Sequence, residues 1–181
     1  MRKQTLKQFL LIADFISSYS VNTLSEAGCP RLIAGKTPPA DLNDLSFGEL
    51  MELQNISTKE DAFIKPAMVV LRLSREQALK CQSREIVPFS YWCADEVKRI
   101  GELFKSTSSE PTSEERQAGA EHLQFGLFGI IDWFALRMGI TDHNEVINIP
   151  WIRIYKCLEM DHQKNIYEKR LREIYAKKQK A

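Results

Sequence analysis

The run AEHLQFGLFGIIDWFALRMG, residues 120–139, decides how this sequence folds. It is apolar over most of its length, shows no strand-like alternation, and meets a glycine at position 139, where a helix can end in a left-handed residue. The run therefore predicts a helix. Because its apolar residues fall on most sides of that helix, we expect it to be the central buried helix, with residues 125–138 in the core.

The segments before this run also predict helices. SFGE, residues 46–49, has the capping-box pattern, in which Ser46 accepts from the backbone of Glu49 and Glu49 reaches back. SREQ, residues 74–77, repeats that pattern. Further helices are expected at about 58–73 and 86–105. Each of these two contains a proline, and we expect a kink or a break just before Pro66, whereas Pro88 falls in the first turn, where it is tolerated.

The N-terminal portion predicts a helix followed by a long irregular segment. Basic residues and an apolar patch open the chain, but Asp14 interrupts the patch and its spacing is helical, so we expect a helix and no signal peptide. Glycines and prolines crowd the stretch after it, and a segment of that length in a compact domain is functional, a linker, or an arm that packs on a neighbour. The expected fold class is all-α, an irregular helical bundle with a long Pro/Gly-containing arm after the first helix.

The domain organisation follows from these segments and from STSSEPTSEE, a polar internal boundary before an acidic helix start. We expect the two helical subdomains to form one compact unit. The predicted segments are an N-terminal helix at 1–19, an arm or loop at 20–44, a helical subdomain at 45–107, a linker at 108–113, and a C-terminal helical subdomain at 114–181.

Composition and charge argue for an ordinary globular protein. The chain has 181 residues and a formal net charge of +1, which gives no general attraction to nucleic acid or membranes. The charge is uneven, because residues 41–62 hold six acidic residues against one lysine, and residues 164–181 hold seven basic residues against two glutamates. No apolar run reaches the ~20 residues that a membrane-spanning helix needs, so no span is expected.

The chemical motifs point away from an enzyme. The four cysteines form no CxxC pair, so we expect small buried hydrophobic residues in a reducing compartment. GKT at 35–37 lacks the glycine of a phosphate loop, since Pro30 stands in its place and two prolines follow. The histidines, at 122, 143 and 162, are too far apart in sequence to suggest a shared metal. We expect no catalysis, no cofactor and no metal.

The stretch ITDHNEVINIPWIRIYKCLEMDHQKN, residues 140–165, predicts a joint between two helices. Asp142 and Glu145 suit the start of a short helix, while Asn148 and Pro150 suit the cap and first turn of the last and longest one. Trp151 would then stand at the first turn of that long helix. We interpret the joint as a docking elbow whose indole packs either into its own core or into a partner.

Two stretches carry a resemblance. LNDLSFGELMELQNI with EDAFIKPAMVVL, and NEVINIPWIRIYKCLEMDHQKNIYEKRLREIYAKK, are similar in layout to small helical proteins of tailed bacteriophages, with the composition of the crAss-like phages. The resemblance covers residues 42–73 and 140–178. It implies a virion component of the head–tail junction or tail, made in the host cytoplasm and working through other phage structural proteins, or a tail-assembly chaperone.

The hypothesis that follows is a non-enzymatic structural or adaptor subunit. In a ring of copies, the acidic region of one chain would meet the basic last helix of the next. A second alternative is a small nucleic-acid-binding regulator that uses the same basic helix, with its interleaved tyrosines. The candidates for protein contact are Trp151, Arg153, Tyr155, Lys169, Arg170, Arg172, Asp41, Asp44, Glu49 and Glu52.

Overall fold

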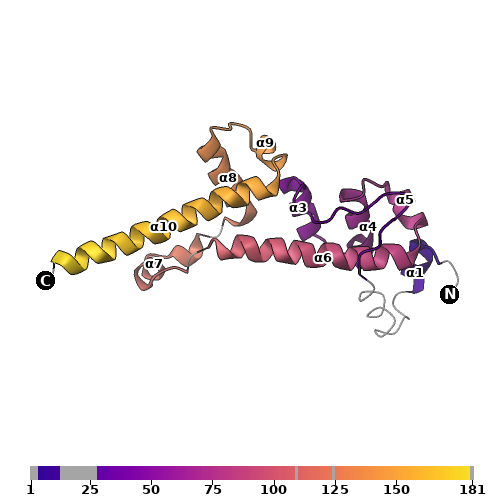
Figure 1. The fold of residues 1–181 in the computed structure, drawn as a ribbon, viewed down its shortest axis with the longest axis horizontal. Coiled ribbons are helices and arrows are strands. Elements are labelled where there is room, and N and C mark those ends of the chain that lie inside the picture. The colour runs from indigo at the N-terminus through magenta and orange to yellow at the C-terminus, as the bar shows by residue number, and fades with distance from the viewer. Residues whose placement is uncertain (1–3, 13–27, 109, 124, 180–181) are drawn as a thin grey trace. The chain divides into compact units, whose positions relative to one another are not determined.

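The computed structural model describes residues 4–12, 28–108, 110–123 and 125–179. Within these residues the chain is mostly helical and has no strand, with isolated backbone bridges at Thr5–Gln82 and Ile33–Lys36. The all-α prediction is confirmed. The helices, shown in Figure 1, are α1 Leu6–Ile12, α3 Phe47–Gln54, α4 Lys59–Val69, α5 Arg75–Lys80, α6 Ser83–Ser106, α7 Ser113–Gln117, the 3₁₀ turn η2 Ala120–His122, α8 Gly126–Met138, α9 His143–Ile147 and α10 Trp151–Gln179.

The chain divides into two compact units, an N-terminal unit, Met1–Arg99, and a C-terminal unit, Ile100–Ala181. The division falls inside α6, whereas the sequence suggested a boundary at 108–113. That predicted linker lies between α6 and α7 and belongs to the C-terminal unit. Of the part of the chain that the structure describes, no helix is long and apolar enough to cross a membrane.

Side chains from α1, α4, α5 and the first half of α6 form the core of the N-terminal unit. Leu6 and Phe9 of α1 enter this core, and the ring of Phe9 meets Phe63 of α4 edge to face, with ring centroids 5.8 Å apart. Cys81 and Cys93 are buried as expected, while Cys29 and Cys157 are only partly buried. The part of the predicted first helix beyond Ile12 lies outside the described residues.

Both predicted capping boxes are present. Ser46 accepts from the backbone N–H of Glu49 at 3.2 Å, and the carboxylate of Glu49 accepts from the backbone N–H of Ser46 at 2.9 Å. Ser74 and Gln77 make the same reciprocal pair at the start of α5. These contacts satisfy backbone donors that the first turn of a helix would otherwise leave unpaired.

The predictions at the two prolines need correction. Helix α4 runs without a break through Pro66, whose buried ring lies in the core. Helix α6 begins at Ser83, three residues before the predicted start, so Pro88 falls in its second turn. The earlier start depends on a distant contact, because the backbone N–H of Ser83 donates to the carbonyl oxygen of Gln4 at 2.9 Å.

The described part of the predicted arm, residues 28–44, is irregular and packs on its own unit. Ile33 and Leu42 are buried. The ammonium of Lys36 donates to the carbonyl oxygens of Leu71 and Arg72, at 2.7 and 3.0 Å, just after α4 ends. Those carbonyls follow a helix C-terminus, where a cation is favoured, so this segment is tied to its own chain.

Two boundaries in the C-terminal unit differ from the prediction. The apolar run 120–139 does not form one helix, because η2 ends at His122 and α8 begins only at Gly126, whose φ is positive (54°). Gly139 ends α8 in the left-handed region, as predicted. Asp142 caps α9 by accepting from the backbone N–H of Asn144, also as predicted. Asn148, however, ends α9 and does not cap α10, which begins after Pro150.

Candidate functional site

Helix α8 carries an exposed apolar surface, contrary to the prediction that residues 125–138 are buried. Leu136 is 77% exposed and Phe128 is 60% exposed. Only three side chains of α8, those of Ile131, Phe134 and Ala135, are buried. We define the α8 apolar face as Phe125, Phe128 and Leu136, flanked by Leu123 and Met138, all of them exposed.

The spacing of the residues explains why one helix has both an inward and an outward apolar surface. Ile131, Phe134 and Ala135 recur at i, i+3 and i+4, which places them on one side of the helix. Phe128, Asp132 and Leu136 recur at i, i+4 and i+8 on another side. A helix that is apolar on more than one side is either enclosed or presents an apolar surface, and α8 does the second.

Neighbouring polar contacts hold α8 in place within the C-terminal unit. The guanidinium of Arg137 pairs with Asp161 of α10 at 2.5 Å and lies over the ring of Trp133, 5.6 Å from its centroid. On the other side, His143 of α9 lies 3.4 Å from the carboxylate of Asp132 and meets the ring of Phe128 edge to face. The α8 apolar face is therefore presented by a helix fixed to both α9 and α10.

Trp151 and Tyr155, two of the sequence-predicted contact residues, lie in the core. Trp151 is 0% exposed and its ring centroid stands 6.0 Å from that of Phe104. The ring of Tyr155 is 5.9 Å from Phe104, and its hydroxyl donates to the carboxylate of Glu159 at 3.1 Å. The elbow that we interpreted as a docking point thus packs its indole into its own unit.

The predicted basic residues lie on the surface of α10. Arg153, Lys169, Arg170 and Arg172 are all exposed. Arg172 pairs with Glu168 at 3.5 Å, and Lys164 approaches the same carboxylate at 3.9 Å. These side chains are available to a partner, which the buried rings of the elbow are not.

The predicted acidic residues are partly neutralised by arginines of the same unit. Glu49 pairs with Arg72. Burial raises the pKa of Glu49, but hydrogen bonds from Arg72 and from the backbone of Ser46 outweigh it and hold that pKa below its ordinary value. Asp44 and Glu52 are exposed. Outside the predicted set, Glu60 and Asp61 both approach Arg75, at 2.5 and 3.9 Å.

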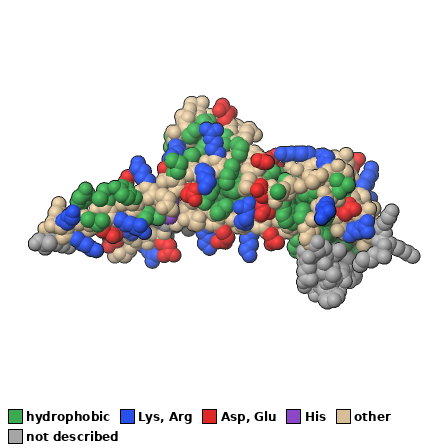
Figure 2. Space-filling view, in the orientation of Figure 1, with side chains coloured by type: hydrophobic (Ala, Val, Ile, Leu, Met, Phe, Trp, Pro, Cys, Tyr) green, Lys and Arg blue, Asp and Glu red, His purple; other side chains and the backbone are tan. Residues whose placement is uncertain are grey.

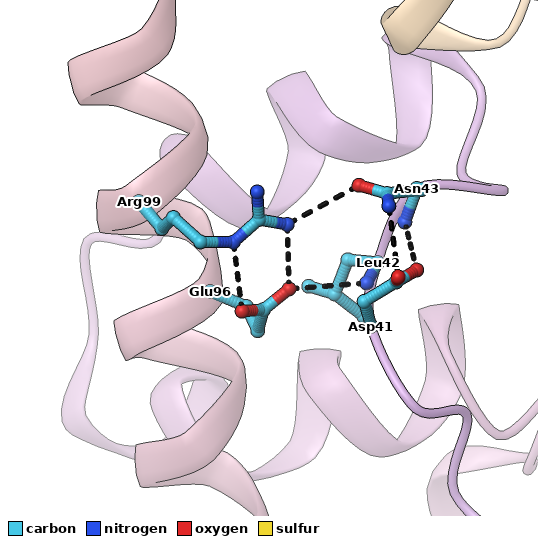
Figure 3. A network of polar contacts seen from close by, with 5 residues as sticks. All are labelled: Asp41, Leu42, Asn43, Glu96 and Arg99. Atoms are coloured by element: carbon cyan, nitrogen blue, oxygen red, sulfur yellow. Dashed lines mark hydrogen bonds and ion pairs between the residues drawn. The ribbon is translucent and has the colours of Figure 1, made fainter.

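Asp41 belongs to a polar network that fastens residues 41–43 to α6 (Figure 3). Glu96 accepts from Arg99 at 2.9 and 2.8 Å and from the backbone N–H of Leu42 at 3.2 Å. Arg99 also donates to Asn43, whose side-chain amide donates to Asp41. The hydrogen bonds from Arg99 lower the pKa of Glu96. Every hydrogen bond in this network joins residues that belong either to 41–43 or to α6. We therefore interpret its role as structural.

A groove of about 680 Å³ lies in the N-terminal unit. Its lining is mainly apolar, with Phe9, Leu10 and Leu11 from α1 and Phe63 from α4. Among the residues that the structure describes, the charged side chains at the groove are those of Lys7, Lys59 and Glu60. A hollow of this composition suits an apolar side chain of another molecule.

Metal and acid–base chemistry find little support in the described residues. Among them, no group of three or more His, Cys, Asp or Glu side chains is placed to hold a metal ion. His143 stands beside a single carboxylate, that of Asp132. Burial raises the pKa of the Cys93 thiol, which disfavours the nucleophilic thiolate.

No protein-family model, curated protein or solved structure matches this chain. The candidate site therefore rests on the sequence and structure of this chain alone. The α8 apolar face was missed in the sequence because an apolar run was interpreted as core. The signal that could have found it is the pair of glycines at 126 and 139, which bound α8 and limit how much of it a core can cover.

Proposed function

We propose that this protein is a non-enzymatic structural or adaptor subunit of a larger assembly, acting through protein–protein contacts. The observation that supports it is the α8 apolar face. Several large apolar side chains exposed on one helix, as at Phe125, Phe128 and Leu136, favour an interaction site over ordinary scattered surface residues. Burying one Phe or Leu side chain contributes about 1.5–3 kcal/mol, so several together can outweigh the cost of association.

The occupant that we propose for this face is a second copy of the chain. The same chain offers both a raised apolar surface, on α8, and an apolar groove, beside α1 and α4. A contact between two different surfaces of identical copies is heterologous and closes into a ring when the rotation allows. We therefore propose that apolar surfaces make the ring contact, in place of the acidic residues of 41–62. Several of those acidic residues already pair with arginines of their own unit.

The setting that we propose is the one implied by the resemblance, a virion protein at the head–tail junction or tail of a tailed phage. The alternative from the same resemblance is a tail-assembly chaperone, which would share the contacts but leave the mature particle. Mass spectrometry of purified virions distinguishes the two, since only the structural subunit is retained.

The experiment that tests the heterologous contact uses two variants that each destroy one surface. Phe128→Glu with Leu136→Glu removes the face, and Leu11→Glu, an exposed residue of the groove, removes its counterpart. Sedimentation should show oligomers for the unmodified chain and monomers for each variant alone. Mixing the two variants should restore a dimer, because one intact face then meets one intact groove.

A matched control is Leu32→Glu, which places the same charge on an exposed leucine outside both surfaces. It should assemble like the unmodified chain. Assembly by either surface variant alone, or a mixture that stays monomeric while the unmodified chain assembles, would contradict the face-and-groove contact. An unmodified chain that stays monomeric at high concentration and joins no particle would contradict the proposed function as a whole.

A further inference from the structure

Asp132 stands in the middle of the α8 apolar face. It falls four residues after Phe128 and four before Leu136, so its side chain emerges on the same side of α8 as theirs. That side chain is 50% exposed. Figure 2 shows charged side chains among the hydrophobic ones on the surface over α8 and α9. A partner that covers Phe128 and Leu136 therefore also removes water from the carboxylate between them.

The group that can compensate this charge is His143, at the start of α9. Its Nε2 lies 3.4 Å from Oδ1 of Asp132, and its ring meets that of Phe128 edge to face, with ring centroids 5.2 Å apart. The side chain of His143 is 40% exposed. Because the imidazole touches both an apolar member of the face and the carboxylate within it, a surface that covers the face covers this pair as well.

The other charged groups near His143 do not balance Asp132. The helix packed against α9 is α8, whose charged residues are Asp132 and Arg137, and Arg137 is held in an ion pair with α10. On α9 itself, Asp142 caps the helix and Glu145 is exposed. Both are acidic. Within the part of the chain that the structure describes, the positive charge available to Asp132 is therefore that of protonated His143.

The protonation state of His143 matters little while the pair is in water and much more once it is covered. An ion pair at an exposed surface contributes little, because water screens both charges. A carboxylate that is taken out of water without an opposite charge is strongly disfavoured, and an imidazolium beside it offsets that cost. A neutral imidazole can donate one hydrogen bond but leaves the negative charge uncompensated. Covering the face therefore favours the protonated form.

We infer that association through the α8 apolar face strengthens as the pH falls, because His143 takes up a proton when the face is covered and then balances the charge of Asp132. This inference rests on the proposed function, since it requires a partner surface on the face. Histidine is the side chain that ordinarily changes charge between about pH 5 and pH 8, so the response falls in that range. One proton taken up on association changes the association constant by at most about tenfold per pH unit.

The test measures self-association of the full chain by sedimentation at pH 8, 7 and 6. The dissociation constant of the unmodified chain should fall about fivefold or more between pH 8 and pH 6. His143→Gln keeps a hydrogen-bond donor but cannot become charged, so its dissociation constant should change by less than about twofold over that range. The matched control is His162→Gln, the same change at a histidine of α10, which should keep the full response.

Asp132→Asn separates this role from a purely structural one. It removes the charge that disfavours covering, so at pH 8 it should associate about fivefold or more tightly than the unmodified chain, and without a pH response. Weaker association of Asp132→Asn would overturn the inference, because a cation of the partner, such as Lys7 or Lys59 at the groove, would then be what pairs with the carboxylate.

Two further outcomes distinguish this inference from the proposed function. Association of the unmodified chain that does not respond to pH, or a response that survives His143→Gln, overturns the pH dependence and leaves the face-and-groove contact standing. An unmodified chain that stays monomeric at all three pH values contradicts both.

Discussion

Phe125 lies across the backbone of Gly129, so closely that a Cβ atom added at Gly129 would stand 2.8 Å from the Cβ of Phe125. The first aromatic residue of the α8 apolar face therefore sits where it does because the residue one turn later has no side chain. A glycine inside a helix normally weakens the helix. Here Gly129 also helps to set the position of Phe125 in the α8 apolar face.

Gly129→Ala tests that link, with Gly101→Ala as its control. Alanine favours a helix interior by about 1 kcal/mol over glycine, and nothing lies within 4 Å of a Cβ at Gly101, so the control should gain about that much stability. At Gly129 the contact with Phe125 should reverse the gain, leaving a net loss of about 1 kcal/mol. Urea unfolding measures both. A gain at Gly129 equal to that at Gly101 would show that Phe125 moves without cost.

Trp151→Ala should lower the free energy of unfolding of the C-terminal unit by about 3–5 kcal/mol, because it empties a fully buried site beside Phe104. Met160→Ala, on the exposed part of the same helix, should change it by no more than about 0.5 kcal/mol. Chemical denaturation followed by circular dichroism compares the two. A small effect at Trp151 would mean that the indole serves a partner instead of its own core.

The network around Glu96 should make the stability of the N-terminal unit depend on pH. The pKa of Glu96 is lowered by Arg99 in the folded protein. Its contribution is therefore complete well above ~4.3, the value in an unfolded chain, and is lost as the pH falls through the lower folded pKa. Glu96→Gln should cost about 1 kcal/mol at pH 7, after allowance for the exposed Arg99, and almost nothing at pH 3.

Asp95→Asn provides the control for that experiment, because Asp95 is the exposed neighbour of Glu96 on α6. It should change stability by less than about 0.5 kcal/mol at pH 7. Unfolding curves at pH 7, 5, 4 and 3 are needed for both variants. If the difference between Glu96→Gln and the unmodified chain persists at pH 3, the ionised carboxylate is not what fastens residues 41–43 to α6.

Lys36→Met should destabilise the N-terminal unit by about 1 kcal/mol, because the ammonium satisfies two carbonyl oxygens after the end of α4. Lys98→Met removes an equally exposed charge from α6 and should have little effect. Hydrogen exchange at residues 28–44 gives a direct measurement, since loss of the Lys36 contacts should increase exchange there. Unchanged exchange would contradict the role of Lys36 as the fastening residue.

The parts of the fold that could be predicted are those set by neighbours in sequence. Ser46 with Glu49, Ser74 with Gln77, and the left-handed Gly139 each depend on partners within one turn, and each is present. The start of α6 could not be predicted, because it depends on Gln4, whose carbonyl receives a hydrogen bond from a residue 79 positions later.

The candidate site was harder to predict than the fold, because the identity of an apolar residue does not show whether its side chain is buried or exposed. Trp151 and Phe128 have similar sequence surroundings, each an aromatic residue near the start of a helix. One is enclosed by Phe104 and Tyr155, while the other is open beside His143. Whether such a residue is buried or exposed depends on how distant helices pack. The periodicity of the sequence does not show that packing.

The bond between Gln4 and Ser83 also sets an order of events during synthesis. At about 5–20 residues per second, the ribosome takes roughly 4–16 seconds to make the residues that separate them. Throughout that interval Leu6 and Phe9 lack the α6 side chains that bury them in the finished core. Faster translation of residues 5–82 would therefore shorten the time for which these two apolar side chains lack their partners in the core.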